Sequence, residues 1–541
     1  MTDLRPDPAR RALMGLYLVA FVSGMTTLAV EISTTRLVGN VFGSSNIVWA
    51  GVIGMTLFYL MIGYFVGGRY ADRRPSFHSF YSLAAWAALS AGAVPHVALP
   101  LLRLAGGALQ QFDVGVSLGA ALSVAVLFAV PMTLLGCIPP FAIRLAVKEV
   151  SGSGRAAGAI YALTTAGSLL GAFGPPLILI PAIGTPATFS LYAAALVLMA
   201  MAGIGLTEKR FALRLAWMPL ALAGLLVTGF RASFASPPPG ATLLFARETR
   251  YNYVQVVELP DQTRQLLLNE GLAVHSVFHP TRIATGQSWD YFLVGPYFNA
   301  SPFRPDRMKR IALLGLAAGT VARQYTVAYG PIPIDGVEID PGIVEVGREY
   351  FEMSMPNLNV IVQDARFALR GLATDYQMIG IDAYRPPYIP WQLTTREFFS
   401  EVRGHLAEDG VVVINVGRTL EDRRLVEAMA ATLLEVFPTV HTMDVPATFN
   451  SILVATLQPT RPQNLVENQL ALASDPGVDP LILSSLDLAL RTLVPTVASD
   501  LVFTDDRAPV ELISDSIVLQ FILGPGAQAR RELLAPTEPS N

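Results

Sequence analysis

Long apolar segments and short polar linkers alternate along the chain up to about Phe230. Most of these segments approach the ~20 apolar residues that a membrane-spanning helix needs. The pattern therefore predicts a multi-pass α-helical membrane domain of about seven helices over residues 1–235. We place the helices at residues 12–34, 46–67, 80–102, 115–143, 157–182, 185–206 and 215–230.

The pattern changes beyond the linker PPPG (237–240), where short apolar runs are separated by turns. YNYVQVVEL (251–259) and TRQLLLNEG (263–271) read as short strands and predict a small β-subdomain over residues 241–300. From Lys309 onward strands alternate with helices, which predicts a Rossmann-like (methyltransferase-like) α/β domain with a mainly parallel sheet over residues 301–525. We expect residues 526–541 to be a disordered tail. The predicted strands are IALLGL, PIDGVEID, NVIVQD, QMIGID and GVVVINV, and helices from about Thr320, Gly342, Arg366 and Thr395 follow the first four.

Basic residues gather in alternate linkers of the apolar half. By the positive-inside rule these linkers are cytoplasmic, so the N-terminus is cytoplasmic and the protein lies in the inner cell membrane. Seven crossings would then place the C-terminal half outside the cell. The last segment, however, has only sixteen residues between Arg214 and Arg231, short for a ~30 Å hydrocarbon core, so we expect the C-terminal half in the cytoplasm. The basic residues are Arg5, Arg10, Arg11, Arg69, Arg73, Arg74, Arg144, Lys148, Arg155, Lys209, Arg210 and Arg214.

Composition narrows the choice of function. The chain is 52% hydrophobic with a mean hydropathy of +0.46, too apolar for an ordinary soluble enzyme, and its net charge of −4 gives no reason to expect a nucleic-acid partner. Cys137 is the only cysteine, which excludes an intrachain disulfide and a thiolate metal cluster, and we expect it to be a buried core residue. Gly167 and Gly171 form a GxxxG pattern that allows close helix approach.

Two features of the apolar half leave a transport role open. Glu31 lies among apolar residues, where an acid can mark an ion or substrate path, form an internal salt bridge or lie near the membrane surface. GGRYADRR (67–74) resembles a loop motif of major-facilitator carriers, and an ordinary cytoplasmic loop explains it equally well.

Small and acidic residues follow the predicted parallel strands, at the edge of the sheet where ligands bind. A turn of small residues, Gly315 to Gly319, lets a ligand approach the backbone, although such turns also occur where a helix packs closely on a strand. Glu338 ends the next strand and can take the hydroxyls of a ribose, and Asp364 can face an adenine amine or simply cap a helix. The absence of GxGxxG favours S-adenosylmethionine or a relative over a dinucleotide. The candidate nucleoside-binding residues are Gly315, Ala317, Ala318, Gly319, Glu338, Ile339, Asp364 and Ala365.

Residues from about 245 to 515 resemble the spermidine synthase (polyamine aminopropyltransferase) family, and the apolar half resembles the membrane domain fused to that fold in many bacterial members. Segments that recur in similar form include SGxxxLxxEI from Ser23, IYALTTAGSLLG (160–171), LTTREFF (393–399) and TDDRAPVE (504–511). The resemblance implies S-adenosylmethionine or its decarboxylated form as cosubstrate, release of 5′-methylthioadenosine, no tightly bound cofactor, no metal and a possible homodimer.

The resemblance also implies which residues act on the substrate, and three motifs depart from the family. The family's GGGDG acid is Ala318 here, Arg385 stands at the second acid of DSSDP, and Trp289-Asp290-Tyr291 replaces Tyr-His-Glu. Asp382 keeps the first acid of DSSDP and is the expected base or amine anchor. The catalytic candidates are Asp382, Tyr384 and Arg385, and the substrate-binding candidates are Trp289, Tyr291, Asn252 and His275.

Three functions fit these residues. The first is an integral-membrane aminopropyltransferase that makes polyamines such as spermidine from decarboxylated S-adenosylmethionine. The second is breakdown of an S-adenosylmethionine-type donor by internal attack of its own amine or carboxylate, which the lost acids and Arg385 favour. The third is a nucleoside-regulated membrane carrier or sensor. The partners implied are a small amine or an internal nucleophile, and the lipid bilayer.

Overall fold

The computed structural model describes residues 8–42, 46–111, 116–147, 152–207, 209–231, 237–238, 240–269, 273–383 and 389–523. The chain divides into two compact units. The helical unit comprises Met1–Phe234 and Arg247–Tyr253, and the α/β unit comprises Ala235–Ala246 and Val254–Asn541. The expected tail at 526–541 lies outside the described residues.

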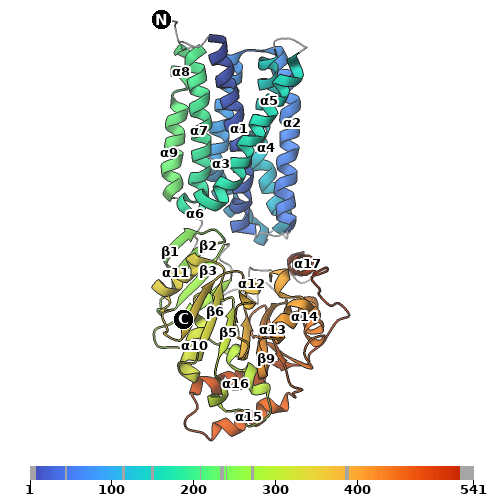
Figure 1. The fold of residues 1–541 in the computed structure, drawn as a ribbon. Coiled ribbons are helices and arrows are strands. Elements are labelled where there is room, and N and C mark those ends of the chain that lie inside the picture. Colours follow the sequence, from blue (N-terminus) through green and yellow to red (C-terminus); the bar gives the residue numbers. More distant parts are fainter. Residues whose placement is uncertain are drawn as a thin grey trace. The chain divides into compact units, whose positions relative to one another are not determined.

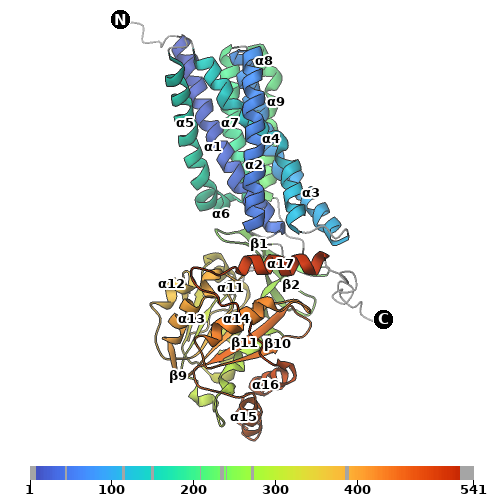
Figure 2. The same cartoon turned by 90° about the vertical axis from the view of Figure 1, so that its right-hand side faces the viewer.

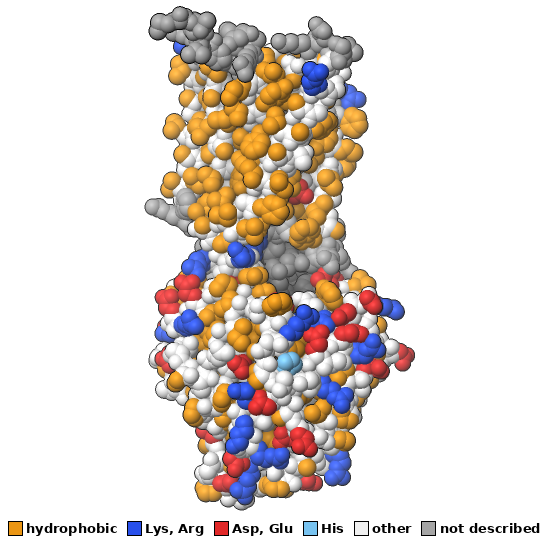
Figure 3. Space-filling view, viewed as in Figure 1, with side chains coloured by type: hydrophobic (Ala, Val, Ile, Leu, Met, Phe, Trp, Pro, Cys, Tyr) orange, Lys and Arg blue, Asp and Glu red, His pale blue; other side chains and the backbone are white. Residues whose placement is uncertain are grey.

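The helical unit is a bundle of long helices that run side by side (Figures 1 and 2). Within the described residues, six helical segments are long and apolar enough to cross a membrane, and α3 is not one of them. The last of the six runs over Lys209–Gly229, which is longer than the sixteen-residue segment that the sequence indicates. Hydrophobic side chains cover the visible face of this unit (Figure 3), which suits contact with lipid. The helices are α1 (Pro8–Phe42), α2 (Asn46–Arg73), α3 (Phe77–Gln111), α4 (Val116–Ala146), α5 (Ser153–Gly174), the π-helical turn η2 (Pro175–Leu179), α6 (Ile180–Ile183), α7 (Thr185–Thr207), α8 (Lys209–Leu215) and α9 (Trp217–Arg231).

Glycines set the closest helix contacts of the bundle. A Cβ on Gly167 would lie 2.0 Å from the carbonyl oxygen of Phe21, so α5 packs directly on the backbone of α1. The predicted role of the GxxxG pattern is thereby confirmed. Gly67 of α2 likewise faces Cys137 of α4, since a Cβ there would lie 2.5 Å from the cysteine Cα. Cys137 is buried, as the sequence predicts.

The segment Arg247–Tyr253 belongs to the helical unit through polar contacts. The Glu248 carboxylate accepts hydrogen bonds from the backbone N–H of Thr185, at the start of α7, and from its hydroxyl at 2.6 Å. Arg36 of α1 donates to the carbonyl oxygens of Tyr251 at 2.8 Å and Thr249 at 3.0 Å, and also to that of Arg250. Asn252, a substrate-binding candidate, lies in this segment.

The α/β unit contains two sheets. The small sheet has the order β1-β2-β3-β4 and matches the predicted β-subdomain. The large sheet has the order β12-β10-β11-β9-β8-β5-β6-β7; its strands β7, β6, β5, β8 and β9 are parallel, and β11, β10 and β12 extend it in antiparallel fashion. The predicted mainly parallel Rossmann-like sheet is confirmed. The strands are β1 (Thr242–Glu248), β2 (Tyr253–Glu258), β3 (Arg264–Leu268), β4 (Val274–Phe278), β5 (Ile311–Leu314), β6 (Ile334–Glu338), β7 (Leu358–Val362), β8 (Tyr376–Ile381), β9 (Leu406–Gly417), β10 (Thr439–Asp444), β11 (Asn450–Thr456) and β12 (Leu493–Val494).

Helices cover both faces of the large sheet (Figure 1). Alternate residues of β5 show why: Ile311 and Leu313 pack into one core, which α10 and α16 cover, whereas Ala312 and Leu314 pack into a second core, which α13 and α14 cover. The helical segments of this unit are η3 (Ser288–Leu293), η4 (Gly295–Phe298), η5 (Pro305–Arg307), α10 (Thr320–Tyr329), α11 (Pro341–Tyr350), α12 (Ala365–Leu369), η6 (Trp391–Leu393), α13 (Arg396–Arg403), α14 (Arg424–Leu434), α15 (Gln463–Ala473), α16 (Pro480–Thr492) and α17 (Val510–Leu523).

Candidate active site

The candidate site lies at the carboxyl ends of β5 and β8, where the strand order of the sheet reverses. The chain passes from β5 to β6 on one side and reaches β8 on the other, and a sheet of this kind binds ligands at such a point. Gly315 follows β5 with φ +96°, and a Cβ on it would lie 2.5 Å from the carbonyl oxygen of Asp382. Only glycine fits there, and it brings the turn directly against the end of β8.

The small-residue turn uses its backbone donors inside the protein. The N–H of Ala317 donates to Glu338 Oε2 at 2.9 Å, and that of Ala318 donates to Ser276 Oγ at 2.9 Å. A phosphate-binding loop needs such N–H groups free to face the phosphate. The turn therefore fits a ligand without phosphates at this point better than it fits a dinucleotide.

Glu338 ends β6 with its side chain 7% exposed. Its Oε1 accepts from the N–H of Asp340 at 3.0 Å, while its Oε2 accepts from Ala317. Burial raises the pKa of Glu338 to about 7, although the two backbone N–H groups act in the opposite direction. Each carboxylate oxygen has a second lone pair, so the side chain can still accept from a ribose hydroxyl.

The neighbouring strand end carries the other nucleoside candidates. Asp364 caps α12, because its Oδ1 accepts from the N–H of Phe367 at 3.1 Å, so the helix-cap alternative is realised. Ala365 begins that helix and is buried. Ile339 after β6 is 39% exposed and Phe367 is 61% exposed, so apolar side chains are available for a flat aromatic ring.

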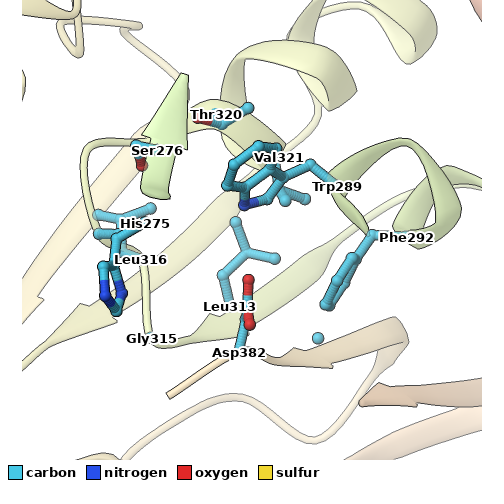
Figure 4. Close-up of a pocket in the computed structure, with 12 residues that line it drawn as sticks. His275, Ser276, Trp289, Phe292, Leu313, Gly315, Leu316, Thr320, Val321 and Asp382 are labelled. Atoms are coloured by element: carbon cyan, nitrogen blue, oxygen red, sulfur yellow. The ribbon is translucent and has the colours of Figure 1, made fainter. Parts of the chain in front are cut away.

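A pocket opens beside the turn and encloses about 10 Å³, room for roughly one water-sized group. Strand β4, η3, the β5–α10 turn and the end of β8 contribute its walls (Figure 4). Most of the walls are apolar or aromatic. The lining residues are His275, Ser276, Trp289, Phe292, Leu313, Gly315, Leu316, Ala317, Thr320, Val321, Gly380 and Asp382.

Asp382 supplies the carboxylate of this pocket, and Figure 4 shows the carboxylate among Leu313, Trp289 and Phe292. Asn415 of β9 donates from Nδ2 to Asp382 Oδ1 at 3.0 Å. Burial raises the pKa of Asp382 to about 6, and the hydrogen bond from Asn415 opposes the rise. The carboxylate is therefore mostly ionised at pH 7. The sequence motifs do not single out Asn415, although a polar residue within the apolar strand GVVVINV is a usable signal.

His275 of β4 contributes the second titratable side chain of the pocket. Its Nε2 atom is buried and has no hydrogen-bond partner among the described residues. Burial lowers the pKa of His275 to about 4, so the imidazole is neutral at pH 7. A neutral imidazole has one nitrogen that accepts a hydrogen bond.

The structure does not bring all the candidates together. Trp289 lines the pocket, but Tyr291 is fully buried in the core of the α/β unit and is not a lining residue, so these two substrate-binding candidates do not face the same pocket. Asn252 belongs to the helical unit. Tyr384 and Arg385 lie outside the described residues.

Comparison with known proteins supports a synthase-like domain. Residues 303–467 match the family model described as "Spermine/spermidine synthase domain". A probable polyamine aminopropyl transferase of Bifidobacterium longum is 31% identical over 294 residues, which are 52% of this chain and 64% of that protein. A polyamine aminopropyltransferase of Vibrio vulnificus is 31% identical over 188 residues, which are 34% of this chain and 60% of that protein. The chain thus spans less than two thirds of these curated relatives.

Solved structures similar to this chain carry related names. A probable spermidine synthase from Corynebacterium glutamicum has 21% identity and a TM-score of 0.37, with coverage of 45% of this chain and 89% of that one. Spermidine synthase from Thermotoga maritima has 15% identity and a TM-score of 0.35, with coverage of 52% and 87%. The family match confirms the resemblance that the sequence motifs predict for residues 303–467, and the curated relatives agree with it.

Proposed function

We propose that the protein is an aminopropyltransferase, because residues 303–467 match the family model described as "Spermine/spermidine synthase domain". It would use decarboxylated S-adenosylmethionine, transfer the aminopropyl group to an amine and release 5′-methylthioadenosine. The observation that carries the proposal is the Asp382 carboxylate, hydrogen-bonded by Asn415 in a largely apolar pocket, beside the turn that is bonded to Glu338.

The proposed reaction is a displacement at carbon. The lone pair of a neutral amine attacks the carbon next to the donor's sulfonium, the C–S bond breaks, and its electron pair remains on sulfur. The leaving group is a neutral thioether, and the new secondary ammonium passes one proton toward Asp382 and then to water. Since the sulfonium is already activated, the protein mainly has to align the two reactants and hold the amine.

Each side chain has a role in this proposal. Glu338 accepts hydrogen bonds from the ribose hydroxyls, and Asp364 lies at the adenine end. Trp289 places an aromatic face beside the sulfonium and ammonium charges, where cation–π attraction stabilises them. Asp382 anchors the attacking amine.

The test is release of methylthioadenosine by the full-length protein in detergent. We expect release to require decarboxylated S-adenosylmethionine and an added amine, and to saturate with both. Release at the same rate without any amine would contradict the proposal and indicate internal attack of the donor. No release with any donor and amine, from protein that binds methylthioadenosine, would favour a carrier or sensor.

We also propose that the helical unit spans the inner membrane, with the N-terminus and the α/β unit in the cytoplasm. The basic residues in alternate linkers support a cytoplasmic N-terminus, and the six apolar helical segments of the described chain support a membrane-spanning unit. The placement of the α/β unit follows from its proposed nucleoside cosubstrate, which is scarce outside the cell. Reporter fusions after Arg74, Lys148 and Arg210 should all read cytoplasmic, and a mixed pattern would contradict the orientation. A fusion after Gly240 tests the α/β unit separately, and an external signal there would overturn its placement.

A further inference from the structure

Helix α12 is too short to hold its own position. It has five residues, Ala365–Leu369, and a helix of this length makes too few internal hydrogen bonds to offset the entropy lost in its first turn. Its buried side chains, Ala365, Ala368 and Leu369, pack into the core on one side. Asp364, which we propose at the adenine end of the site, is the N-cap of this helix. The placement of the Asp364 carboxylate therefore depends on the contacts that fix α12.

Arg366 fixes α12 to two other segments of the α/β unit. Its guanidinium donates to both carboxylate oxygens of Asp505, from Nη1 to Oδ1 and from Nη2 to Oδ2, each at 2.8 Å. It donates to Glu401 Oε1 at 2.7 Å from Nη2 and at 3.2 Å from Nε, and to the carbonyl oxygen of Gln392 at 3.3 Å from Nη1. The Arg366 side chain is 15% exposed, so solvent screens these ion pairs little. A paired Arg–carboxylate contact also fixes direction, and so it can orient a short helix.

Every N–H group of the Arg366 guanidinium is used in these contacts. A guanidinium has five N–H donors, and the bonds to Asp505, Glu401 and Gln392 take them all. Arg366 therefore has no donor left for a ligand. Any effect that it has on nucleoside binding must pass through α12.

Asp505 lies in a tight turn of the segment TDDRAPVE. Thr504 and Arg507 exchange two backbone hydrogen bonds across the turn, at 3.0 and 2.9 Å. Before the turn, Phe503 is fully buried, and its carbonyl oxygen accepts from the N–H of Arg396 at 2.9 Å. The turn is thus tied to the core of the α/β unit, and it presents the Asp505 carboxylate on a fixed backbone.

The segment LTTREFF supplies the other contacts. Thr395 donates from Oγ1 to Asp505 Oδ1 at 2.6 Å and also caps α13, where its Oγ1 accepts from the N–H of Phe398 at 3.2 Å. Glu401 lies further along α13. Within the described chain, no residue of LTTREFF or TDDRAPVE lines the pocket. The two segments instead meet at one side chain of α12, which gives them a role that the pocket alone does not explain.

We propose that Arg366 is a positioning residue for the donor. Together with Thr395, Glu401 and Asp505 it forms a cluster, the Arg366 clamp, which holds the start of α12 where we propose that the adenine binds. This inference rests on the proposed function and adds a residue to its nucleoside end. Since no member of the clamp lines the pocket, its loss should weaken nucleoside binding equally in the ground state and in the transition state. KM for the donor should then rise while kcat stays the same.

Arg366→Gln tests the proposal, because it keeps a polar side chain and removes the paired donors. In the full-length protein, affinity for methylthioadenosine, measured by calorimetry, should fall tenfold or more, about 1.4 kcal/mol. KM for decarboxylated S-adenosylmethionine should rise by the same factor, and kcat should stay within about twofold. Asp505→Asn should give the same profile, and the double variant should lose little more than either single variant, because both changes break one contact. Additive losses in the double variant would show that Arg366 and Asp505 act separately and would overturn the inference.

Arg424→Gln is the matched control. It breaks an Arg–Asp pair of the same kind, in which Arg424 Nη2 lies 2.6 Å from Asp422 Oδ2, and neither residue lines the pocket. Nucleoside affinity should be unchanged in this variant. Unchanged affinity in a folded Arg366→Gln protein, or an equal loss in Arg424→Gln, would overturn the inference while leaving aminopropyl transfer intact. No binding of methylthioadenosine by the unaltered protein would contradict the proposed function, and the inference with it.

Hydrogen exchange on the unaltered protein decides the inference if the variants fail to fold. Saturation with methylthioadenosine should slow the exchange of backbone N–H groups in residues 364–369 and also in residues 503–507, because the clamp joins the two segments. Helix α15 serves as the reference and should not change. Protection confined to residues 364–369 would show that the clamp does not respond to the nucleoside, and would overturn the inference.

Discussion

The two ends of the candidate site hold their carboxylates in different ways. Glu338, at the nucleoside end, has both oxygens bonded to backbone N–H groups of the turn and of Asp340. Asp382, at the transfer end, is held at one oxygen by the Asn415 side chain and faces an apolar pocket. The first carboxylate is therefore part of the turn's architecture, whereas the second is available to a reactant. A carboxylate thus serves binding at one end and reaction at the other.

The largest effect should come from Asp382→Asn, which preserves shape and removes the charge. Methylthioadenosine release should fall by roughly 10²–10⁴, because the attacking amine loses its anchor and proton acceptor. Methylthioadenosine binding, measured by calorimetry, should change little, since Glu338 is untouched. If release persists at the original rate, the assignment of reaction to the Asp382 end is wrong.

Glu338→Ala should give the next largest effect, and unlike Asp382→Asn it should weaken the binding of methylthioadenosine. Affinity for methylthioadenosine should drop tenfold or more, about 1.4 kcal/mol. The free energy of unfolding should also fall by about 1–3 kcal/mol, because the N–H groups of Ala317 and Asp340 lose their acceptor. Asp479→Ala is the matched control outside the site: it removes the N-cap of α16 and should destabilise the protein by about 1 kcal/mol without changing nucleoside affinity. Unchanged nucleoside affinity in Glu338→Ala would remove this residue from the site.

The pH dependence separates the two ends further. Asp382 is active when ionised, and its pKa is raised to about 6, so kcat at saturating donor and amine, where Glu338 is already engaged by the donor, should rise with pH through about 6 and level off above it. Below that pH the value should fall up to tenfold for each pH unit. A profile measured at saturating amine, flat from pH 5 to pH 7, would show that no carboxylate of this pKa takes part.

The smallest effect is expected for Asn415→Ala. The Nδ2 group of Asn415 donates to the ionised form of Asp382 and so lowers the pKa of that carboxyl. Removing this group should therefore shift the rising part of the pH–rate profile to higher pH. At pH 8 the rate should change only a few-fold, which distinguishes this positioning residue from Asp382 itself. A uniform loss of rate with no shift of the limb would indicate a merely structural role.

Sequence alone predicted the parallel sheet and the acids at its strand ends, because strand periodicity and strand-end position are local properties. It did not predict Asn415, which reaches Asp382 only because β9 lies next to β8 in the sheet. It also grouped Trp289 with Tyr291. These residues lie in a 3₁₀-helix, where a spacing of two residues turns side chains to different sides; both are buried in the core, and Trp289 alone of the two lines the pocket.

The packing of Gly67 against Cys137 has a practical consequence. The chain has a single thiol, and it is enclosed where α2 and α4 meet. Water-soluble maleimides react with exposed thiolates and should leave this one unlabelled. The unaltered protein is therefore a ready background for cysteine labelling: a cysteine introduced in any polar linker would be the reactive group, and its labelling from either side of a sealed vesicle would report on which side that linker lies.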